Sequence, residues 1–314
     1  MKIIFAGSSG LAVPCLKALM EADGHTMLGV ITQPDRPKGR GLKESQTAVK
    51  QAALKYPGLA GRIFQPESIN APDFIDTLKK LGPDITVVVA YGQKLSGRAL
   101  ESAPHGCINM HPSLLPRYRG AAPVNHAIRN GDKTTGVTIF RLVEKMDAGP
   151  IINRIKTDIE DSETAVELAQ RLSDLGAKAL IKAIGAIADG RAVYQAQNDE
   201  EASLAPKLKK SDGVINWAGP ARSIFNQFRA MKPWPGTHTN WNNLKIEIDG
   251  MRLISDDATG GRPGQLAGAE NDFIAVQAQP GLVGITRLKP AGRRELNVRE
   301  FVNGYRIKIG DILG

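Results

Sequence analysis

Apolar and polar positions in the first 190 residues follow a pattern that predicts buried strands joined by amphipathic helices. Residues 2–6 form a short apolar run that ends in a glycine turn, and residues 11–19 continue with helical apolar spacing. Residues 25–31 form a second apolar run, so these segments predict a βαβ unit of about 30 residues. Three further segments predict strands: residues 84–90, 107–111 and 136–140. The first is a continuous apolar run, which suits a parallel strand buried on both faces.

Two other stretches have the apolar spacing of helices. They cover residues 73–81 and residues 162–189. The second predicts one or two helices that begin at Ser162, with Glu163 and Thr164 as capping residues. Because helices and strands alternate along the chain, we predict an α/β fold for residues 1–190, with a doubly wound, Rossmann-like sheet.

The pattern changes after residue 190. Residues 191–212 include the charged run from Lys207 to Asp212 and predict a linker. Residues 219–231 then predict a helix. Short apolar runs separated by Gly, Pro, Asn and Asp predict strands at residues 245–248, 273–276 and 284–288. We therefore predict a second domain over residues 213–314, a small OB-like β-barrel.

Composition narrows the class of protein. A chain of 314 residues with 42% hydrophobic content can form two domains with buried cores. It contains no apolar run of about 18 residues that could span a membrane and no signal-peptide pattern, so we expect a cytoplasmic protein without a membrane partner. Its two cysteines, Cys15 and Cys107, lack metal-ligand spacing, which argues against a disulfide framework or a zinc site.

The net charge of +9 is distributed unevenly. Counted along the sequence, residues 201–314 contain 16 Lys and Arg against 11 Asp and Glu, and residues 1–200 contain 25 against 21. A basic excess favours polyanionic partners, above all nucleic acids. An ordinary basic surface gives the same count, so charge alone leaves both interpretations open.

The first predicted strand ends in Gly7-Ser8-Ser9-Gly10, which invites comparison with a dinucleotide-binding turn. That fingerprint requires a G-x-G-x-x-G spacing and an acidic residue after the second strand, where this chain has Ile31-Thr32-Gln33. The pattern fails, so we interpret Gly7 as a structural turn.

The densest candidate chemistry begins at the end of the predicted strand 107–111. Asn109 and His111 are two residues apart, so they point to the same face of an extended strand. Asp147 lies in a glycine-containing loop after the next predicted strand. Each of these residues alone is more often structural, so the prediction depends on the three together.

Acyl transfer to an amine requires these three residue types. A fixed neutral donor such as the Asn109 amide can face the oxygen that becomes negatively charged. His111 can accept the proton that the amine loses, and Asp147 can orient the imidazole and balance its charge. The amine attacks directly, so the reaction needs neither a nucleophilic side chain nor a metal.

At these residues the chain resembles a known family. The run Asn109-x-His111-Pro112-Ser113-Leu114-Leu115-Pro116 with Gly120, followed by Asp147-x-Gly149, is similar to the signature of folate-dependent formyltransferases. The resemblance to those that act on methionyl-tRNA covers nearly the whole chain, through residues 5–7, 33–41, 88–92, 119–123 and 232–236. The chain departs from the usual pattern at Ser8-Ser9-Gly10 and at Gln93-Lys94, which puts only details of the substrate pocket in doubt.

The resemblance implies a formyltransferase domain that uses 10-formyltetrahydrofolate as formyl donor, without a metal. It makes Asn109, His111 and Asp147 the catalytic residues. Ser113, Leu114, Leu115 and Pro116 would line the tetrahydrofolate site. Val89, Ala90, Tyr91 and Gly92, with the loop around Asp147, would hold the pterin.

The resemblance also implies initiator methionyl-tRNA as the acceptor, formylated for translation initiation by a protein that we expect to be a monomer. The basic loop with Arg36, Lys38 and Arg40 would reach the acceptor stem, and Lys207 would contribute to a basic second domain. Two alternatives stay open: a formyltransferase for another amine, such as an amino sugar nucleotide, and an RNA-binding protein without catalysis.

Overall fold

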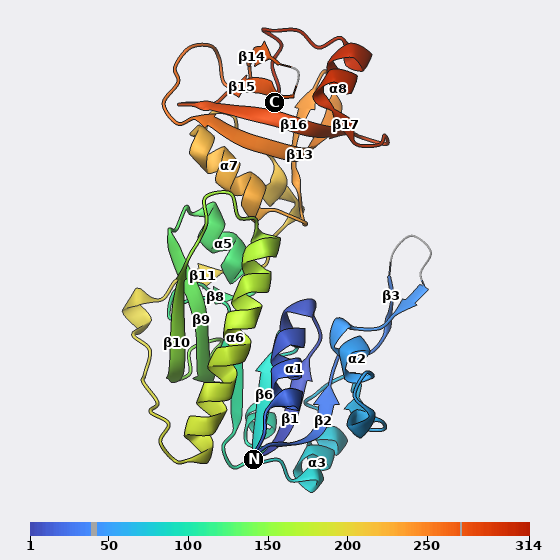
Figure 1. Ribbon diagram of the computed structural model, residues 1–314, viewed down its shortest axis with the longest axis vertical. Helices are drawn as coiled ribbons and strands as arrows, with labels where there is room; N and C mark the ends of the chain where they lie inside the picture. Colours follow the sequence, from blue (N-terminus) through green and yellow to red (C-terminus); the bar gives the residue numbers. More distant parts are fainter. Residues whose placement is uncertain (39–42, 271) are drawn as a thin grey trace. The chain divides into compact units, whose positions relative to one another are not determined.

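The computed structural model describes residues 1–38, 43–270 and 272–314, and the chain forms two compact units (Figure 1). The first unit contains residues 1–123, 134–158 and 169–205. The second contains residues 124–133, 159–168 and 206–314. Two short segments of the predicted first domain, residues 124–133 and 159–168, therefore belong to the second unit.

A seven-stranded sheet in the order β10-β9-β7-β6-β1-β2-β5 forms the first unit. Its strands are β1 (Lys2–Gly7), β2 (Thr26–Ile31), β5 (Ile63–Phe64), β6 (Ile85–Val89), β7 (Cys107–His111), β9 (Thr134–Arg141) and β10 (Ile151–Asp158). The five strands from β7 to β5 are parallel, whereas β9 is antiparallel to β7 and β10 to β9. The predicted α/β, Rossmann-like fold is confirmed, with two antiparallel strands added at one edge.

Helices cover both faces of this sheet. They are α1 (Val13–Glu21), α2 (Ala48–Ala53), α3 (Pro72–Leu81), α4 (Gly97–Leu100) and α6 (Ala165–Ala188), with 3-10 turns η1 (Gly10–Ala12), η2 (Pro57–Leu59) and η3 (Asp199–Glu201). In Figure 1, α1 and α6 lie in front of the sheet. On the opposite face, Ile75 of α3 and Ala99 of α4 belong to one apolar cluster with Ile4 and Val88. The central strands are thus buried on both sides, as their continuous apolar runs predict.

Two details of this unit differ from the prediction. Helix α6 begins at Ala165 rather than at Ser162, although Thr164, one of the predicted capping residues, does cap it: Glu167 Oε2 accepts hydrogen bonds from Thr164 N (2.8 Å) and Oγ1 (2.7 Å). Strand β10 is missing from the prediction because it is an edge strand with alternating exposed polar residues rather than an apolar run. At Gly7 a Cβ atom would lie 2.9 Å from Val89 O, so the close approach of β6 favours glycine at this position.

The predicted linker differs from the observed organisation. Residues 191–205 belong to the first unit, where β11 (Leu204–Ala205) pairs in parallel with β8 (Arg119–Gly120). We call residues 191–205 the strap. A second small pairing, between β3 (Arg36–Lys38) and β4 (Lys43–Ser45), forms a hairpin in the predicted basic loop.

An antiparallel sheet forms most of the second unit. Its strands are β12 (Thr237–Trp241), β13 (Leu244–Ser255), β16 (Leu282–Pro290), β15 (Ile274–Gln277) and β14 (Leu266–Ala269) in this order, with β17 (Leu296–Asn297) paired to β16. The helical segments are α5 (Pro123–Arg129), η4 (Lys210–Gly213), α7 (Ala221–Ala230) and α8 (Val298–Tyr305). This confirms an antiparallel-sheet domain, and its description as an OB-like barrel stays a prediction.

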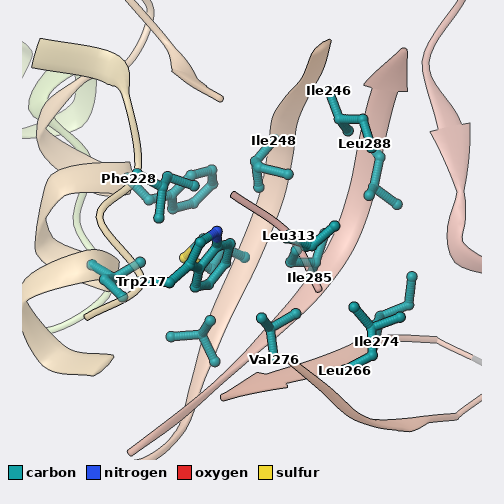
Figure 2. Close-up of a cluster of buried hydrophobic side chains, with 14 of the residues drawn as sticks. Trp217, Phe228, Ile246, Ile248, Leu266, Ile274, Val276, Ile285, Leu288 and Leu313 are labelled. Carbon is teal, nitrogen blue, oxygen red and sulfur yellow. The ribbon is translucent and has the colours of Figure 1, made fainter. Parts of the chain in front are cut away.

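The core of the second unit lies between α7 and the sheet. Figure 2 shows Trp217 and Phe228 facing the inward side chains of β13, β15 and β16. Trp217 Nε1 donates to Thr239 Oγ1 at 2.9 Å, so its one polar atom is satisfied. Trp234, by contrast, is 47% exposed and is not part of this core.

No helix among the described residues combines the length and the hydropathy needed to cross a bilayer.

Candidate active site

Asn109 and His111 lie on β7, in the middle of the sheet of the first unit. Asn109 pairs in register with Val88 of β6 on one side and with Phe140 of β9 on the other. His111 ends the strand, at the edge where open α/β sheets bind their ligands. The predicted strand 107–111 has the same bounds as β7, so these two residues stand where the sequence analysis places them.

Asp147 reaches this edge by a longer route. Because β9 runs antiparallel to β7, it ends beside the start of β7, where Leu142 N donates to Cys107 O at 2.8 Å. The loop of residues 142–150 then brings Asp147 back to His111, with 3.8 Å between Asp147 Oδ2 and His111 Nδ1. The three predicted catalytic side chains are thus brought together by β7 and one loop.

The environment of His111 identifies the nitrogen that can act as a base. The ring is 4% exposed, and its Nε2 lies 2.8 Å from the carbonyl oxygen of Tyr118. A carbonyl oxygen can only accept, so we assign the proton of the neutral ring to Nε2. Nδ1 therefore carries the lone pair, and it faces the carboxylate of Asp147.

Burial sets the charge of this imidazole. Desolvation lowers the pKa of His111 below its usual range, and this effect outweighs Asp147 and the Tyr118 carbonyl, which both raise the pKa. His111 is therefore neutral at pH 7 and able to accept a proton, while Asp147 stabilises the imidazolium once it forms.

Asp147 is held in a fixed orientation. Its backbone has a φ of 50°, in the left-handed region that aspartate tolerates better than most residues. Its side chain is 13% exposed, and Oδ2 accepts a hydrogen bond of 2.8 Å from Gly120 N. One carboxylate oxygen therefore faces both the imidazole and a backbone amide.

Asn109 has an unused polar group. Its Oδ1 is buried and has no hydrogen-bond partner within the described part of the chain. A buried polar atom without a partner costs about 1–3 kcal/mol, so such an atom calls for an explanation. The two ends of an amide are assigned from their partners, so the side chain is free to turn its NH₂ group toward a ligand.

The predicted tetrahydrofolate residues are mostly buried. Ser113 and Leu115 are both 0% exposed, and Pro116 is buried as well. Ser113 Oγ donates to Arg117 O at 2.7 Å, and Leu115 N donates to Thr138 Oγ1 at 3.1 Å. Of these four residues, only Leu114 is partly exposed, so the others shape the loop rather than offer side chains to a ligand.

The predicted pterin residues follow β6 directly. Ala90 and Gly92 are exposed and have φ values of 44° and 95°, whereas Val89 and Tyr91 are buried. The ring of Tyr91 belongs to the apolar cluster on one face of the sheet, and burial raises its pKa to about 12. A ligand at this edge can thus meet Ala90 and Gly92 but not the Tyr91 ring.

The structure describes only some of the residues that are predicted to bind RNA. Arg36 is exposed at the base of the hairpin, and its Nη2 lies 3.1 Å from Glu67 Oε2. Lys38 ends β3, and Arg40 lies outside the described residues. Lys207 is exposed in the second unit.

Sequence reasoning missed the strap residue Gln197. Its Nε2 donates to the carbonyl oxygens of Asp147 (2.8 Å) and Gly149 (2.7 Å). Nothing in the sequence marks this glutamine, because it follows Asp147 by 50 residues and stands in a polar segment. Across the described residues, no three His, Cys, Asp or Glu side chains gather closely enough to hold a metal ion.

The fold and the site agree with the comparisons to known proteins, which define the class. A sequence model of the family described as "Formyl transferase" matches residues 1–184, and one described as "Formyl transferase, C-terminal domain" matches residues 207–306. The fold is shared with an N-formyltransferase from Helicobacter canadensis, solved with folinic acid and dTDP-3-aminofucose. That structure has a TM-score of 0.69 and 18% identity, over 91% of this chain and 99% of that one. The protein is a formyl-transferring enzyme.

Sequence relatives identify the particular family. Methionyl-tRNA formyltransferase from Halothermothrix orenii is 40% identical over 100% of both chains. The protein of that name from Bacillus subtilis is 36% identical over 100% of this chain and 98% of its own. The chain belongs to the methionyl-tRNA formyltransferase family.

Proposed function

We propose that the protein transfers the formyl group of 10-formyltetrahydrofolate to the α-amino group of methionyl initiator tRNA. The products are tetrahydrofolate and N-formylmethionyl-tRNA, the aminoacyl-tRNA that initiates translation. The observation that carries this proposal is the buried, neutral His111, whose Nδ1 faces Asp147 at 3.8 Å beside the unsatisfied amide of Asn109.

The donor supplies a formyl carbon that the amine attacks, so the new C–N bond forms while negative charge develops on the formyl oxygen. The Asn109 amide, turned with its NH₂ group toward that oxygen, donates a hydrogen bond that strengthens as the charge grows. The unsatisfied Oδ1 supports this role, because this buried atom has no hydrogen bond within the described residues that would be lost when the amide turns.

His111 Nδ1 accepts the proton that the attacking amine loses. The resulting imidazolium is stabilised by Asp147 on one side and by the Tyr118 carbonyl on the other. When the bond to the folate nitrogen breaks, the imidazolium returns its proton to that leaving nitrogen, and His111 is neutral again. One residue thus serves as base and then as acid, and the cycle needs no other proton carrier.

The folate donor fits the residues at this edge. The exposed residues Ala90 and Gly92 follow β6, which pairs with β7, and they offer surface to a pterin ring, while the partly exposed Leu114 offers apolar surface. We assign the donor site to this surface.

The acceptor assignment rests on the family and on charge. Relatives that cover the whole chain carry the name methionyl-tRNA formyltransferase, and the chain has a net charge of +9. Arg36, Lys38, Arg40 and Lys207 would bind the RNA backbone, because cationic side chains replace counterions at phosphates. We expect the protein to act as a monomer, in the cytoplasm where charged tRNA is used.

A transfer assay with parallel acceptors tests this proposal. Methionyl initiator tRNA and an amino sugar nucleotide are offered separately with 10-formyltetrahydrofolate, and formylated product is measured for each. We expect transfer to the tRNA and none above background to the sugar. Transfer to the sugar alone would replace the acceptor while keeping the chemistry, and transfer to neither would refute the proposed function.

A further inference from the structure

The position of Asp147 has to be maintained by its surroundings. A non-glycine residue in the left-handed region persists only where neighbouring contacts hold the backbone there. Asp147, with a φ of 50°, is such a residue, and its carboxylate position depends on that backbone. The contacts that hold residues 147–149 therefore control the distance between Asp147 and His111.

Gln197 of the strap makes two of these contacts with one amide nitrogen. Its Nε2 donates to the carbonyl oxygens of Asp147 (2.8 Å) and Gly149 (2.7 Å), on either side of Ala148. The backbone of Gly149 is also packed closely against Arg141, since a Cβ atom on Gly149 would lie 1.7 Å from Arg141 O. The glutamine amide thus joins the loop of Asp147 to the strap.

The orientation of this amide is fixed by Arg119. Gln197 Oε1 accepts hydrogen bonds from Arg119 Nε (3.1 Å) and Nη2 (2.7 Å), and the Arg119 side chain is 5% exposed. Arg119 Nη1 in turn donates to Asp199 Oδ1 at 2.8 Å. A reversed amide would place NH₂ against guanidinium donors and oxygen against two carbonyl oxygens, so only one orientation satisfies all partners.

We infer that Gln197 is a positioning residue for formyl transfer, which acts by holding Asp147 against the His111 imidazole. This inference rests on the proposed catalytic role of Asp147. Gln197 does not face the reacting groups itself, so its effect passes through the carboxylate. Arg119 serves the same purpose one step further away, because it fixes the amide.

The substitution Gln197→Glu separates hydrogen bonding from size. Glutamate has nearly the same shape and can still accept from Arg119, but it cannot donate to the two carbonyl oxygens. We expect turnover to fall by about 10- to 100-fold, as small displacements of a catalytic group commonly cause. The Michaelis constants for both substrates should change little, because no proposed substrate contact is removed.

The pH dependence of the transfer rate distinguishes a positioning role from a purely structural one, because a purely structural role would leave this dependence unchanged. Asp147 is the charged group that raises the pKa of His111, against the lowering by burial. If Asp147 moves away, the pKa falls further, so the acidic limb of the rate profile shifts to lower pH. Gln197→Met, which also removes the donor but adds no charge, should shift it in the same direction.

Gln195→Glu is the matched control. Gln195 lies on the same strap and is exposed, and its Oε1 only accepts, from Arg154 Nη2 at 3.0 Å. Replacing the Gln195 amide by a carboxylate keeps the oxygen that accepts from Arg154, and it removes no hydrogen bond to a carbonyl of the Asp147 loop. We expect its turnover and pH profile to match those of the unmodified enzyme.

A double-mutant cycle with Asp147→Asn tests whether Gln197 affects turnover through the Asp147 carboxylate. If Gln197 acts through the carboxylate, adding Gln197→Met to Asp147→Asn lowers turnover by less than threefold beyond Asp147→Asn alone. Fully multiplicative losses, or an unchanged pH limb in both Gln197 variants, would overturn the inference. If Asp147→Asn itself has no effect, the proposed role of Asp147 is wrong, which is a different outcome from a silent Gln197.

Discussion

Replacing Asp147 by asparagine removes one charge from the site and keeps its shape. The asparagine Oδ1 can still accept the hydrogen bond from Gly120 N, so the loop keeps that contact. Two unit charges 3.8 Å apart interact by roughly 4 kcal/mol at an effective dielectric constant of about 20. The 13% exposure of the carboxylate leaves little room for screening by water.

That energy corresponds to roughly three pKa units or about a thousandfold in rate if the imidazolium were fully formed in the transition state. Because the proton is only partly transferred there, we expect turnover to fall by about 10- to 1000-fold. The sign of the pH effect follows from the charge. Asp147 raises the pKa of His111, so its loss lowers that pKa and moves the acidic limb of kcat/KM to lower pH.

The assay is the rate of formyl transfer to methionyl-tRNA measured from about pH 5 to 9, a window that brackets the ordinary pKa of histidine. The parent enzyme and Asp147→Asn are compared, and near-ultraviolet circular dichroism confirms that both are folded. An acidic limb that stays in place or moves to higher pH would show that the carboxylate does not stabilise the imidazolium, and the reasoning would fail.

Three other outcomes follow from the structure. His111→Ala and Asn109→Ala should each lower turnover by about two to four orders of magnitude, and a folded variant with near-normal turnover would remove that residue from the mechanism. Lys207→Ala should weaken tRNA binding in a filter assay and make it less dependent on salt, by about one unit of slope; an unchanged slope would place Lys207 away from the RNA. Trp217→Ala should lower the free energy of unfolding by about 3–5 kcal/mol in urea titrations, because it empties a core position and leaves Thr239 Oγ1 without its partner; a loss below about 1 kcal/mol would contradict this packing.

The central strands and the catalytic residue types could be predicted from the sequence because their signals are local. Strand β7 is a short, mostly apolar segment whose bounds match the prediction, and Asn109 and His111 share one of its faces by spacing alone. Strand β10 was missed for the opposite reason. As an edge strand it alternates partly buried and exposed residues, so its composition resembles that of a loop.

Long-range contacts account for what could not be predicted. The return of the 142–150 loop to His111 depends on β9 being antiparallel, which no apolar run indicates. The contacts of Gln197 lie in a polar segment that reads as a linker. The predicted division at residue 190 likewise could not show that segments 124–133 and 159–168 belong to the second unit, where Arg129 Nη1 lies 3.2 Å from Asp212 Oδ1.

The proposed chemistry depends most directly on Nδ1 of His111 being unprotonated in the resting enzyme. Nitrogen NMR of protein labelled with ¹⁵N-histidine reports the protonation of both ring nitrogens, and His111→Gln identifies the signals. At pH 7 we expect a neutral ring with its proton on Nε2, bound to the Tyr118 carbonyl, and a pKa below the usual value for histidine. A proton on Nδ1 at pH 7, in either the neutral or the charged ring, would contradict the assignment of His111 as the base.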